Sequence, residues 1–437
     1  MKVVIVGSGI GGLACAVACA QESLEVTILE RAPQLVPVGA GIQVPPNAAR
    51  VARYLGILPK LLEKGVALDG IHYRRYANGK MLFDRPNVKT DEQYGAPWLV
   101  IHRADYIDAL YQAAIAAGVE LQFGAEVDHV DFERTEVRLK TGETMSADVI
   151  VGADGLWSTS RDRLLGFPSP PVETGDLAYR GTFTKAQLEA LNDLEVNKLC
   201  SKKVVTAWLG PSKHAVFYPL KGGQQFNLVL LRPDNLPIGA RQEQGEVDEM
   251  QATFEEWDER LRRIISCLSA ASKWKLCHHE ELRTWTRGSV ALLGDACHPT
   301  LPYQAQGAAM AVEDGAVLGK LLGLFKKSIH LRSEVKHPVA EILRLYESLR
   351  KARTTLNVKG AIASQYWYHL PDGPEQEARD AELETAKWCN DTKWNLTSVD
   401  YQNDLLGFDV IKDCEGAFET WRQKRDNSDG RQFTAET

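Results

Sequence analysis

Short glycine-rich and acidic motifs in this sequence have the residue types and spacing of nucleotide chemistry. The first motif runs from Gly7 to Gly12, and Gly7, Gly9 and Gly12 fit the pattern GxGxxG. In this pattern the glycines permit a tight turn, a close approach of a pyrophosphate to the backbone, and close packing of a helix on a strand. Glu30 follows at the end of the next apolar run, where its carboxylate can accept hydrogen bonds from both ribose hydroxyls. The motif predicts a nucleotide site; the alternative is a structural turn with a surface glutamate.

Two further motifs each follow a short apolar run that predicts a buried strand. Residues 148–152 precede Ala153-Asp154-Gly155-Leu156-Trp157-Ser158-Thr159-Ser160-Arg161, and residues 289–293 precede Gly294-Asp295-Ala296-Cys297-His298-Pro299. The glycine motif alone does not distinguish FAD from NAD, so these later motifs carry the distinction. At the end of a strand, the Asp295 carboxylate can accept a hydrogen bond from a ribityl hydroxyl of a flavin.

The elements that must position these motifs form an α/β fold. The order strand, helix, strand over residues 2–30 predicts a βαβ unit and therefore a Rossmann-like domain. From about residue 175 to 285 short alternating runs are separated by glycine and proline, which predicts an inserted, mainly antiparallel sheet beside one amphipathic helix over Met250–Leu268. The expected parts are 1–175 and 286–370 for the two halves of the nucleotide-binding domain, 176–285 for a substrate-binding domain, and 371–437 for a helical C-terminal extension.

The composition limits the kinds of partner that we expect the chain to bind. The net charge is −7 over 437 residues and no basic stripe occurs, which argues against nucleic acid because phosphate binding needs a basic face. No apolar run is long enough to cross a bilayer, so we expect no membrane association. The eight cysteines are scattered without ligand-like spacing, which predicts no metal site and favours a reducing, cytoplasmic location.

In this order, the three motifs resemble those of the class A flavoprotein monooxygenases, the p-hydroxybenzoate hydroxylase-like superfamily. The nearest similarity is to salicylate hydroxylases and 6-hydroxynicotinate monooxygenases, including fungal relatives, over roughly residues 1–370. The resemblance implies non-covalent FAD and dioxygen, with NADH or NADPH as a transient co-substrate that has no Rossmann domain of its own. In the family a flavin hydroperoxide attacks an electron-rich ring carbon of a small aromatic substrate.

The resemblance also assigns residues to the cofactor. Asp295 would bond the ribityl chain, and the helix that starts near Gly307 would direct its amides at the flavin pyrimidine edge. The loop before this helix usually reads Gly-Gln-Gly; here it begins with Ala305, for which we expect only a small change. Asp154 and Arg161 would serve flavin and pyridine nucleotide, unless they form a structural pair that holds the turn. The other residues assigned to cofactor binding are Arg31, Gln43, Arg103, Val127, Pro299, Gln306 and Ala308.

A phenol is activated towards oxygen attack when it is ionised, so a base near the substrate is expected. His214 is our candidate base, because relatives of the hydroxynicotinate type have a histidine at the matching position; the alternative is a solvent-facing histidine at a strand end. The Tyr303 hydroxyl is expected to bond the substrate phenol, although relatives often have histidine there. Arg180 is the first candidate to bind a substrate carboxylate and Arg232 the second, unless both are structural.

The resemblance, together with these candidate residues, implies hydroxylation of a salicylate-like phenolic acid, either simple or with loss of the carboxylate, by a monomer or homodimer. One alternative is hydroxylation or epoxidation of a larger secondary metabolite such as an indole, a polyketide phenol or a terpenoid. A different class of function is a flavin protein without oxygenation, either a dehydrogenase or oxidase or a binding module. Oxygen incorporation into the product distinguishes the hydroxylases from the oxidases.

Overall fold

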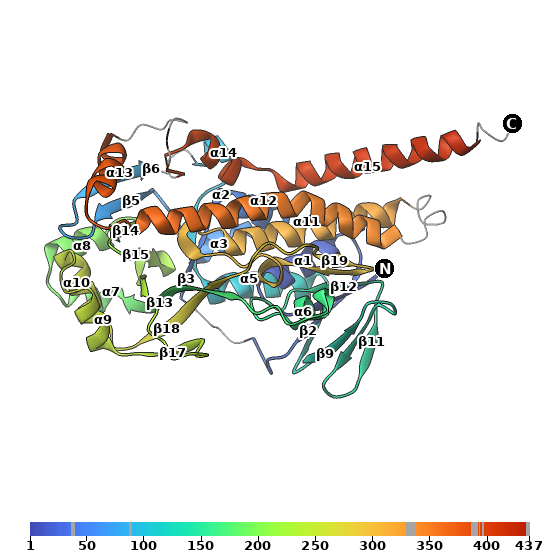
Figure 1. Ribbon diagram of the computed structural model, residues 1–437, viewed down its shortest axis with the longest axis horizontal. Helices are drawn as coiled ribbons and strands as arrows, with labels where there is room; N and C mark the ends of the chain where they lie inside the picture. Colours follow the sequence, from blue (N-terminus) through green and yellow to red (C-terminus); the bar gives the residue numbers. More distant parts are fainter. Residues whose placement is uncertain are drawn as a thin grey trace.

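The structure is a computed structural model that describes residues 1–35, 40–86, 90–328, 338–385, 392, 394–395 and 397–433. Two large sheets form its body, and two long helices, α11 (Gly307–Lys327) and α12 (Pro338–Tyr368), lie side by side along it (Figure 1). The first half of α12 contacts the first sheet, and its end packs in the core beside the second sheet. Helix α12 therefore links the two parts of the fold.

The first sheet has six strands and follows from the buried β-branched runs that flank the motifs. Its order is β19-β20-β12-β1-β2-β8, and the pairs from β20 to β8 are parallel. This arrangement brings the carboxyl ends of β1, β2, β12 and β20 to one edge, where the motifs follow the strands. The bounds are β1 (Lys2–Val6), β2 (Glu25–Glu30), β8 (Glu120–Phe123), β12 (Val149–Gly152), β19 (Thr286–Arg287) and β20 (Val290–Leu292).

Helices α1 (Ile10–Gln21), α5 (Arg103–Ala116) and α11 pack together on one face of this sheet. Small residues bring α1 and α11 unusually close. A Cβ on Gly315 would lie 2.6 Å from the backbone nitrogen of Cys15, and a Cβ on Gly319 would lie 2.5 Å from the Ala18 Cβ. The opposite face is covered by a small sheet of β9 (Val127–Asp131), β10 (Glu136–Leu139) and β11 (Thr144–Ser146).

The second sheet has eight strands in the order β17-β18-β13-β16-β15-β14-β5-β6. All of its pairs are antiparallel except β14 with β5. One face packs against short helices at one end of the molecule, and the other face packs against the end of α12 and the C-terminal extension (Figure 1). The bounds are β5 (Gly70–Arg75), β6 (Met81–Pro86), β13 (Val172–Thr184), β14 (Val204–Gly210), β15 (Lys213–Leu220), β16 (Gln225–Pro233), β17 (Gln242–Gly245) and β18 (Ala271–His278).

The fold class predicted from the sequence is confirmed, with two corrections to its details. Strands β5 and β6 belong to the second sheet although they lie within the stretch 1–175 that we assigned to the nucleotide-binding part. The single helix expected over Met250–Leu268 is two helices, α9 (Val247–Thr253) and α10 (Glu259–Ser266). The chain breaks there because Asp258 caps α10 and accepts a hydrogen bond of 2.7 Å from the indole of Trp208.

A third, three-stranded sheet and the remaining helices complete the described part. The C-terminal helices α13 and α14 close over the second sheet, whereas α15 extends away from the body towards the C-terminus (Figure 1). The third sheet comprises β3 (Gly41–Val44), β7 (Leu99–His102) and β4 (Val66–Ala67), and the other helices are α2 (Pro46–Tyr54), α3 (Leu58–Lys64), α4 (Thr90–Tyr94), α6 (Thr159–Leu165), α7 (Lys185–Glu189), α8 (Leu194–Cys200), α13 (Pro374–Thr385), α14 (Val399–Gly407) and α15 (Val410–Phe433).

Candidate active site

The glycine motif forms the tight loop between β1 and α1 that the sequence predicted. Gly7 has a φ of +105°, and a Cβ there would lie 2.6 Å from the carbonyl oxygen of Ala153. A Cβ on Gly12 would lie 2.1 Å from the carbonyl oxygen of Gly7, so any side chain there would separate helix from loop. Gly9 has open space in front of it and faces a cavity. The loop therefore offers free backbone at the N-terminus of α1, the arrangement that accepts a pyrophosphate.

Glu30 ends β2 beside this loop. One carboxylate oxygen accepts hydrogen bonds from the Ser8 backbone N–H (2.9 Å) and hydroxyl (2.7 Å), and the other accepts from the Ala32 N–H (2.9 Å). Burial acts to raise the pKa of Glu30, but the hydrogen bonds from Ala32 and Ser8 outweigh it and lower the pKa. Glu30 is thus ionised and holds the loop in place, in addition to the ribose contact that we predict for it.

A cavity of about 320 Å³ opens between the first sheet and the second. The N-termini of α1 and α11 form one side, and β3 with strands β13, β15 and β16 forms the other. This is the place where a flavin would meet a substrate. The predicted site residues that line it are Gly9, Gly12, Gln43, Arg103, Arg180, His214, Asp295, Gly307 and Ala308.

Asp295 lies in a one-turn helix directly after β20 and is accessible from the cavity. Protein surrounds the carboxyl on its other sides, and this burial raises its pKa. Opposite it, α11 begins at Gly307 and directs its first amides towards the cavity. Ala305 before it has a φ of +56°, a conformation that costs a non-glycine residue roughly 1 kcal/mol. The alanine is therefore tolerated at a small cost, as we expected.

Behind the start of α11 lies a buried charged cluster, defined here as Glu313, Asp314, Arg350 and Arg353. Arg350 is fully buried; its Nε donates to Asp314 and its Nη2 to Glu313, both at 2.7 Å. Arg353 donates a further bond of 2.9 Å to Glu313. Burial acts to raise the pKa of Glu313, but Arg353 and Arg350 outweigh it and lower the pKa to about 2.

The charged cluster is bonded to the loops that border the cavity. Asn47 donates to Glu313 (2.8 Å) and to Gln306 (3.0 Å), which precedes α11. Asp314 accepts from the Gly294 N–H (3.1 Å) and lies 2.5 Å from the His298 Nε2. Gln306 therefore acts through its neighbours, because its side chain is 2 % exposed and bonded to Asn47. These contacts fix both loops relative to α11 and α12.

Several predicted residues lie outside the lining of the cavity. Asp154 accepts hydrogen bonds from Ser158 (2.5 Å) and from the Ser160 N–H (2.9 Å), so it holds the turn into α6. Arg161 is buried and donates to backbone carbonyls, including that of Ser169 at 2.9 Å, rather than to Asp154. Each residue therefore has structural contacts of its own, and the direct pair of the structural alternative is not formed. The other predicted site residues outside this lining are Gly7, Glu30, Arg31, Val127, Pro299, Tyr303 and Gln306.

The structure corrects our choice of Arg232 as the second candidate to bind a substrate carboxylate, because its side chain does not face the cavity. Its guanidinium donates to the Glu249 carboxylate (3.0 Å), the Thr253 hydroxyl (3.2 Å) and its neighbour's carbonyl. These bonds join β16 to α9 on the other side of the sheet. Arg232 therefore has a structural role. The prediction was based on the residue type alone, which does not show which groups the guanidinium bonds.

A second, smaller pocket adjoins the cavity on the side of the second sheet. Its free volume is about 80 Å³, and Gln43, His214, Val216, Pro302 and Ala305 line both spaces. We call this space the inner pocket. Five of its 18 lining residues are aromatic, namely Tyr73, Trp98, Tyr303, Trp367 and Tyr368.

The inner pocket also holds a cation that the sequence did not single out. Arg85 of β6 is 4 % exposed and lies 5.2 Å from the centre of the Trp98 ring. Burial lowers the pKa of its guanidinium. Arg180 lines the larger cavity instead, where burial also lowers its pKa. The cation nearest to a ligand of the inner pocket is therefore Arg85.

His214 is buried at the junction of cavity and inner pocket, so it is not the solvent-facing residue of the alternative interpretation. Its Nδ1 lies 2.7 Å from Nε2 of His369, and burial, followed by the charge of His369, moves its pKa well below the usual value. Tyr303 lines the inner pocket and its hydroxyl donates to Asp176 (2.8 Å), so its contact with the substrate phenol stays a prediction. Sequence reasoning missed Arg85, Asp176 and His369 because none belongs to a motif.

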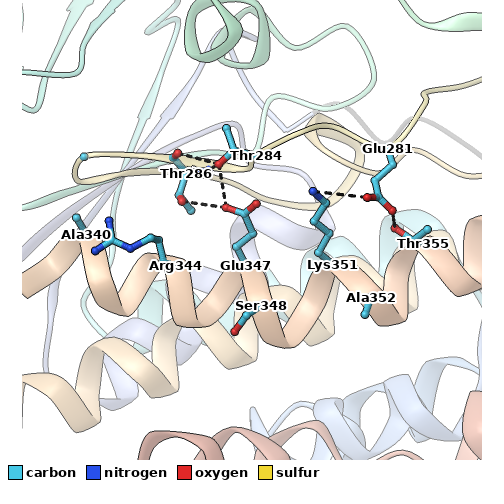
Figure 2. A pocket seen from close by; sticks show the side chains of 11 residues that line it. Glu281, Thr284, Thr286, Ala340, Arg344, Glu347, Ser348, Lys351, Ala352 and Thr355 are labelled. Carbon is cyan, nitrogen blue, oxygen red and sulfur yellow. Dashed lines mark hydrogen bonds and ion pairs between the residues drawn. The ribbon is translucent and has the colours of Figure 1, made fainter. Parts of the chain in front are cut away.

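An open groove of about 750 Å³ lies elsewhere, between α12 and the segment around β19 (Figure 2). Its charged residues bond within the groove: Glu347 accepts from Thr284 and Thr286, both at 3.0 Å, and Glu281 lies between Lys351 and Thr355. The groove shares no lining residue with the cavity or the inner pocket.

Two kinds of feature are absent from the described residues. No group of three or more histidine, cysteine, aspartate or glutamate side chains there could hold a metal ion. No helix in the described ranges combines the length and apolar character needed to cross a bilayer.

Comparison with known proteins agrees with this geometry. The model of the FAD binding domain family matches residues 1–360. The chain is 39% identical over 428 residues to the FAD-dependent monooxygenase OpS4 of Beauveria bassiana, covering 95% of this chain and 97% of that protein. It is 36% identical over 380 residues to 3-hydroxybenzoate 6-hydroxylase 1 of Aquipseudomonas alcaligenes, covering 85% and 91%. A solved salicylate hydroxylase substrate complex has the same fold, with a TM-score of 0.77 at 23% identity over 95% of this chain and 98% of that one.

Proposed function

The chain belongs to the FAD binding domain family as an FAD-dependent aromatic monooxygenase, and we propose that it hydroxylates a small phenolic acid, using dioxygen and either NADH or NADPH. The observation that carries the proposal is the inner pocket, which places a buried histidine between a flavin-sized cavity and an aromatic wall. A relative's name, 3-hydroxybenzoate 6-hydroxylase 1, specifies a substrate of this kind.

The residues present fit FAD. The glycine loop and the N-terminus of α11 offer backbone amides to negative charge, and Asp295 offers an acceptor to a ribityl hydroxyl. Bound and reduced, the flavin supplies the oxygen-transferring chemistry. Without a second nucleotide-binding unit in the sequence, we expect the nicotinamide donor to bind transiently.

His214 is proposed to take the proton of the substrate phenol. With Nδ1 engaged by His369, Nε2 is the ring nitrogen left for a ligand. Because burial keeps the pKa of the ring low, His214 is neutral at pH 7 and can accept a proton. Ionisation raises the electron density of the ring carbons ortho and para to the phenol, which are the carbons that oxygen attacks. The buried aromatic wall holds the ring and excludes water.

Arg85 is proposed to bind the carboxylate of the substrate, in place of our first candidate, Arg180. A guanidinium in a buried pocket can form a bidentate pair with a carboxylate, which orients as well as binds it. Arg85 lines the inner pocket, whereas Arg180 lines the flavin cavity. If the carboxylate-bearing ortho carbon faces the flavin, carbon dioxide is lost; if the ring is turned, the carboxylate survives.

The test is oxidation of NADH or NADPH with a panel of salicylate, 3-hydroxybenzoate, 4-hydroxybenzoate and 6-hydroxynicotinate, with product masses under isotopic dioxygen. Oxygen incorporation from one of these acids supports the proposal. Arg85→Met should raise the KM for the acid about 10- to 100-fold, the loss of one charge-assisted hydrogen-bonded contact, with less effect on the matching phenol without a carboxylate. Arg180→Met is the matched control and should not discriminate between acid and phenol.

The second candidate is a larger secondary metabolite. It is favoured by the continuity of the inner pocket with the cavity of about 320 Å³, because one long ligand could occupy both spaces. The smaller free volume of the inner pocket, about 80 Å³, favours a single ring. Strong stimulation by an indole or a polyketide phenol, with none by any acid in the panel, would replace the first proposal by the second.

A further inference from the structure

Behind His214 lies a line of groups that can transfer protons, and it ends at Asp176, which as a residue is 7 % exposed. His369, at the end of α12, places Nε2 at 2.7 Å from Nδ1 of His214. On its other side, Nδ1 of His369 lies 3.8 Å from the Asp176 carboxylate of β13. The side chains of His369 and Asp176 are 11 % and 10 % exposed, whereas His214 as a residue is only 2 % exposed. The line therefore runs from the inner pocket towards solvent.

We propose that His369 and Asp176 form a proton relay that carries the substrate's phenolic proton away from His214. This proposal rests on the proposed function of His214 and deepens it. In the relay, the phenol proton moves to Nε2 of His214, the Nδ1 proton of His214 moves to Nε2 of His369, and the Nδ1 proton of His369 moves to Asp176. The phenol becomes a phenolate, Asp176 becomes protonated, and both rings remain neutral in the other tautomer.

The return of a proton to the product along the same line restores both tautomers. No oxidant or other reactant is needed, because only protons move. The last gap, at 3.8 Å, requires the His369 ring to approach Asp176 by about 1 Å to reach hydrogen-bonding distance. Burial lowers the pKa of His369 to about 4, against the opposing effect of Asp176. Both rings are therefore neutral at pH 7, and the relay stores no positive charge in the buried wall.

Neighbouring side chains fix the positions of the relay residues. Asp176 accepts hydrogen bonds from the Tyr303 hydroxyl (2.8 Å) and from Gln365 (2.6 Å), which fix its carboxylate. The rings of Tyr303 and Tyr368 pack against the His214 ring, with centroids 5.1 Å away in each case. The tyrosines carry no charge at neutral pH, because burial raises the pKa of each. Asp176 is therefore the acidic side chain that faces His369 in this part of the structure.

The first test needs no substrate. In ¹⁵N spectra of histidine-labelled holoenzyme, the hydrogen bond predicts that His369→Gln shifts the Nδ1 resonance of His214, and that Asp176→Asn shifts the resonances of His369. His129→Gln, in β9 at the other end of the molecule, is the matched control and should shift neither. Unshifted His214 resonances in His369→Gln would overturn the relay.

The second test uses the acid that the wild-type enzyme hydroxylates, together with its fluorinated analogues of lower phenol pKa. His369→Gln should retain FAD and hydroxylate about 10- to 100-fold more slowly at pH 7, on the scale of a lost acid–base contribution. The deficit should shrink at high pH or with the fluorinated analogues, because the substrate then arrives already ionised. A deficit that is the same at every pH would assign His369 a structural role and overturn the relay. No response of wild type to any acid would instead remove the proposed substrate class. The comparison would then be made with a phenol that the wild type does hydroxylate, and a deficit independent of pH with that phenol would overturn the relay.

Discussion

Replacing Arg350 tests whether the charged cluster behind α11 holds the flavin loops in place. Arg350→Met removes a guanidinium that is fully buried and bonded at 2.7 Å to both Asp314 and Glu313. Breaking a buried ion pair by removing one partner costs about 3–5 kcal/mol, because an uncompensated charge remains inside the protein. Here each carboxylate keeps another partner, His298 for Asp314 and Arg353 for Glu313. We therefore expect the lower end, about 3 kcal/mol.

The assay is equilibrium urea unfolding of the holoenzyme at pH 7, followed by tryptophan fluorescence. Arg344→Met is the matched control, because it makes the same substitution on the exposed side of the same helix (Figure 2). The control should change the free energy of unfolding by no more than about 0.5 kcal/mol, as is usual for a surface substitution. A loss below about 1 kcal/mol for Arg350→Met, or equal losses in the two variants, would refute the reasoning.

Three further outcomes are expected. Glu30→Ala should weaken FAD binding by about 1.5–3 kcal/mol in a fluorescence titration, because it removes charged hydrogen-bond acceptors; unchanged affinity would leave Glu30 with the loop-holding role alone. His214→Ala should keep its flavin spectrum but lose product formation about 100-fold or more; an unchanged rate and pH profile would exclude it as the base. The pKa of Glu313 is lowered from 4.5 to about 2, so its ionised form contributes stability above about pH 4.5, and this contribution is lost as the pH falls towards 2. The midpoints of unfolding measured at pH 6, 4 and 3 should therefore decline. Midpoints that do not change with pH would contradict the assignment.

The part of the fold that sequence predicted correctly is the part where local chemistry determines the backbone. Gly7 has a positive φ, and there is no space for a side chain at Gly12, so both positions require glycine. The loop can therefore be recognised from the sequence. The break between α9 and α10 was not predictable in this way. Asp258 ends the helical pattern only because Trp208, 50 residues earlier, comes to bond with it.

The same distinction separates the two halves of the site. We expect a flavin to contact loops that follow neighbouring strands of the first sheet, and such loops have short motifs such as Gly294-Asp295. The inner pocket is assembled from β5, β6, β15, the loop before α11, and the ends of α12 and α14, so its residues have no common spacing. Arg85 and His369 lie 284 residues apart in the chain (369 − 85), and neither belongs to a sequence motif.

This assembly explains why the sequence identified the reaction more readily than the substrate. We expect the groups that meet the flavin to tolerate little change, because close packing fixes the backbone of their loops, as it does at Gly7 and Gly12. The side chains of the inner pocket, in contrast, rest on elements that the flavin loops do not constrain; Trp367 comes from the last turn of α12 and Leu405 from the C-terminal extension. Substitutions there can alter the shape and charge presented to a substrate while the sheet, the glycine loop and Asp295 stay in place. We therefore propose that the contacts among β6, α12 and α14 determine the substrate, because they bring Arg85 into the inner pocket and His369, behind that pocket, to the ring of His214.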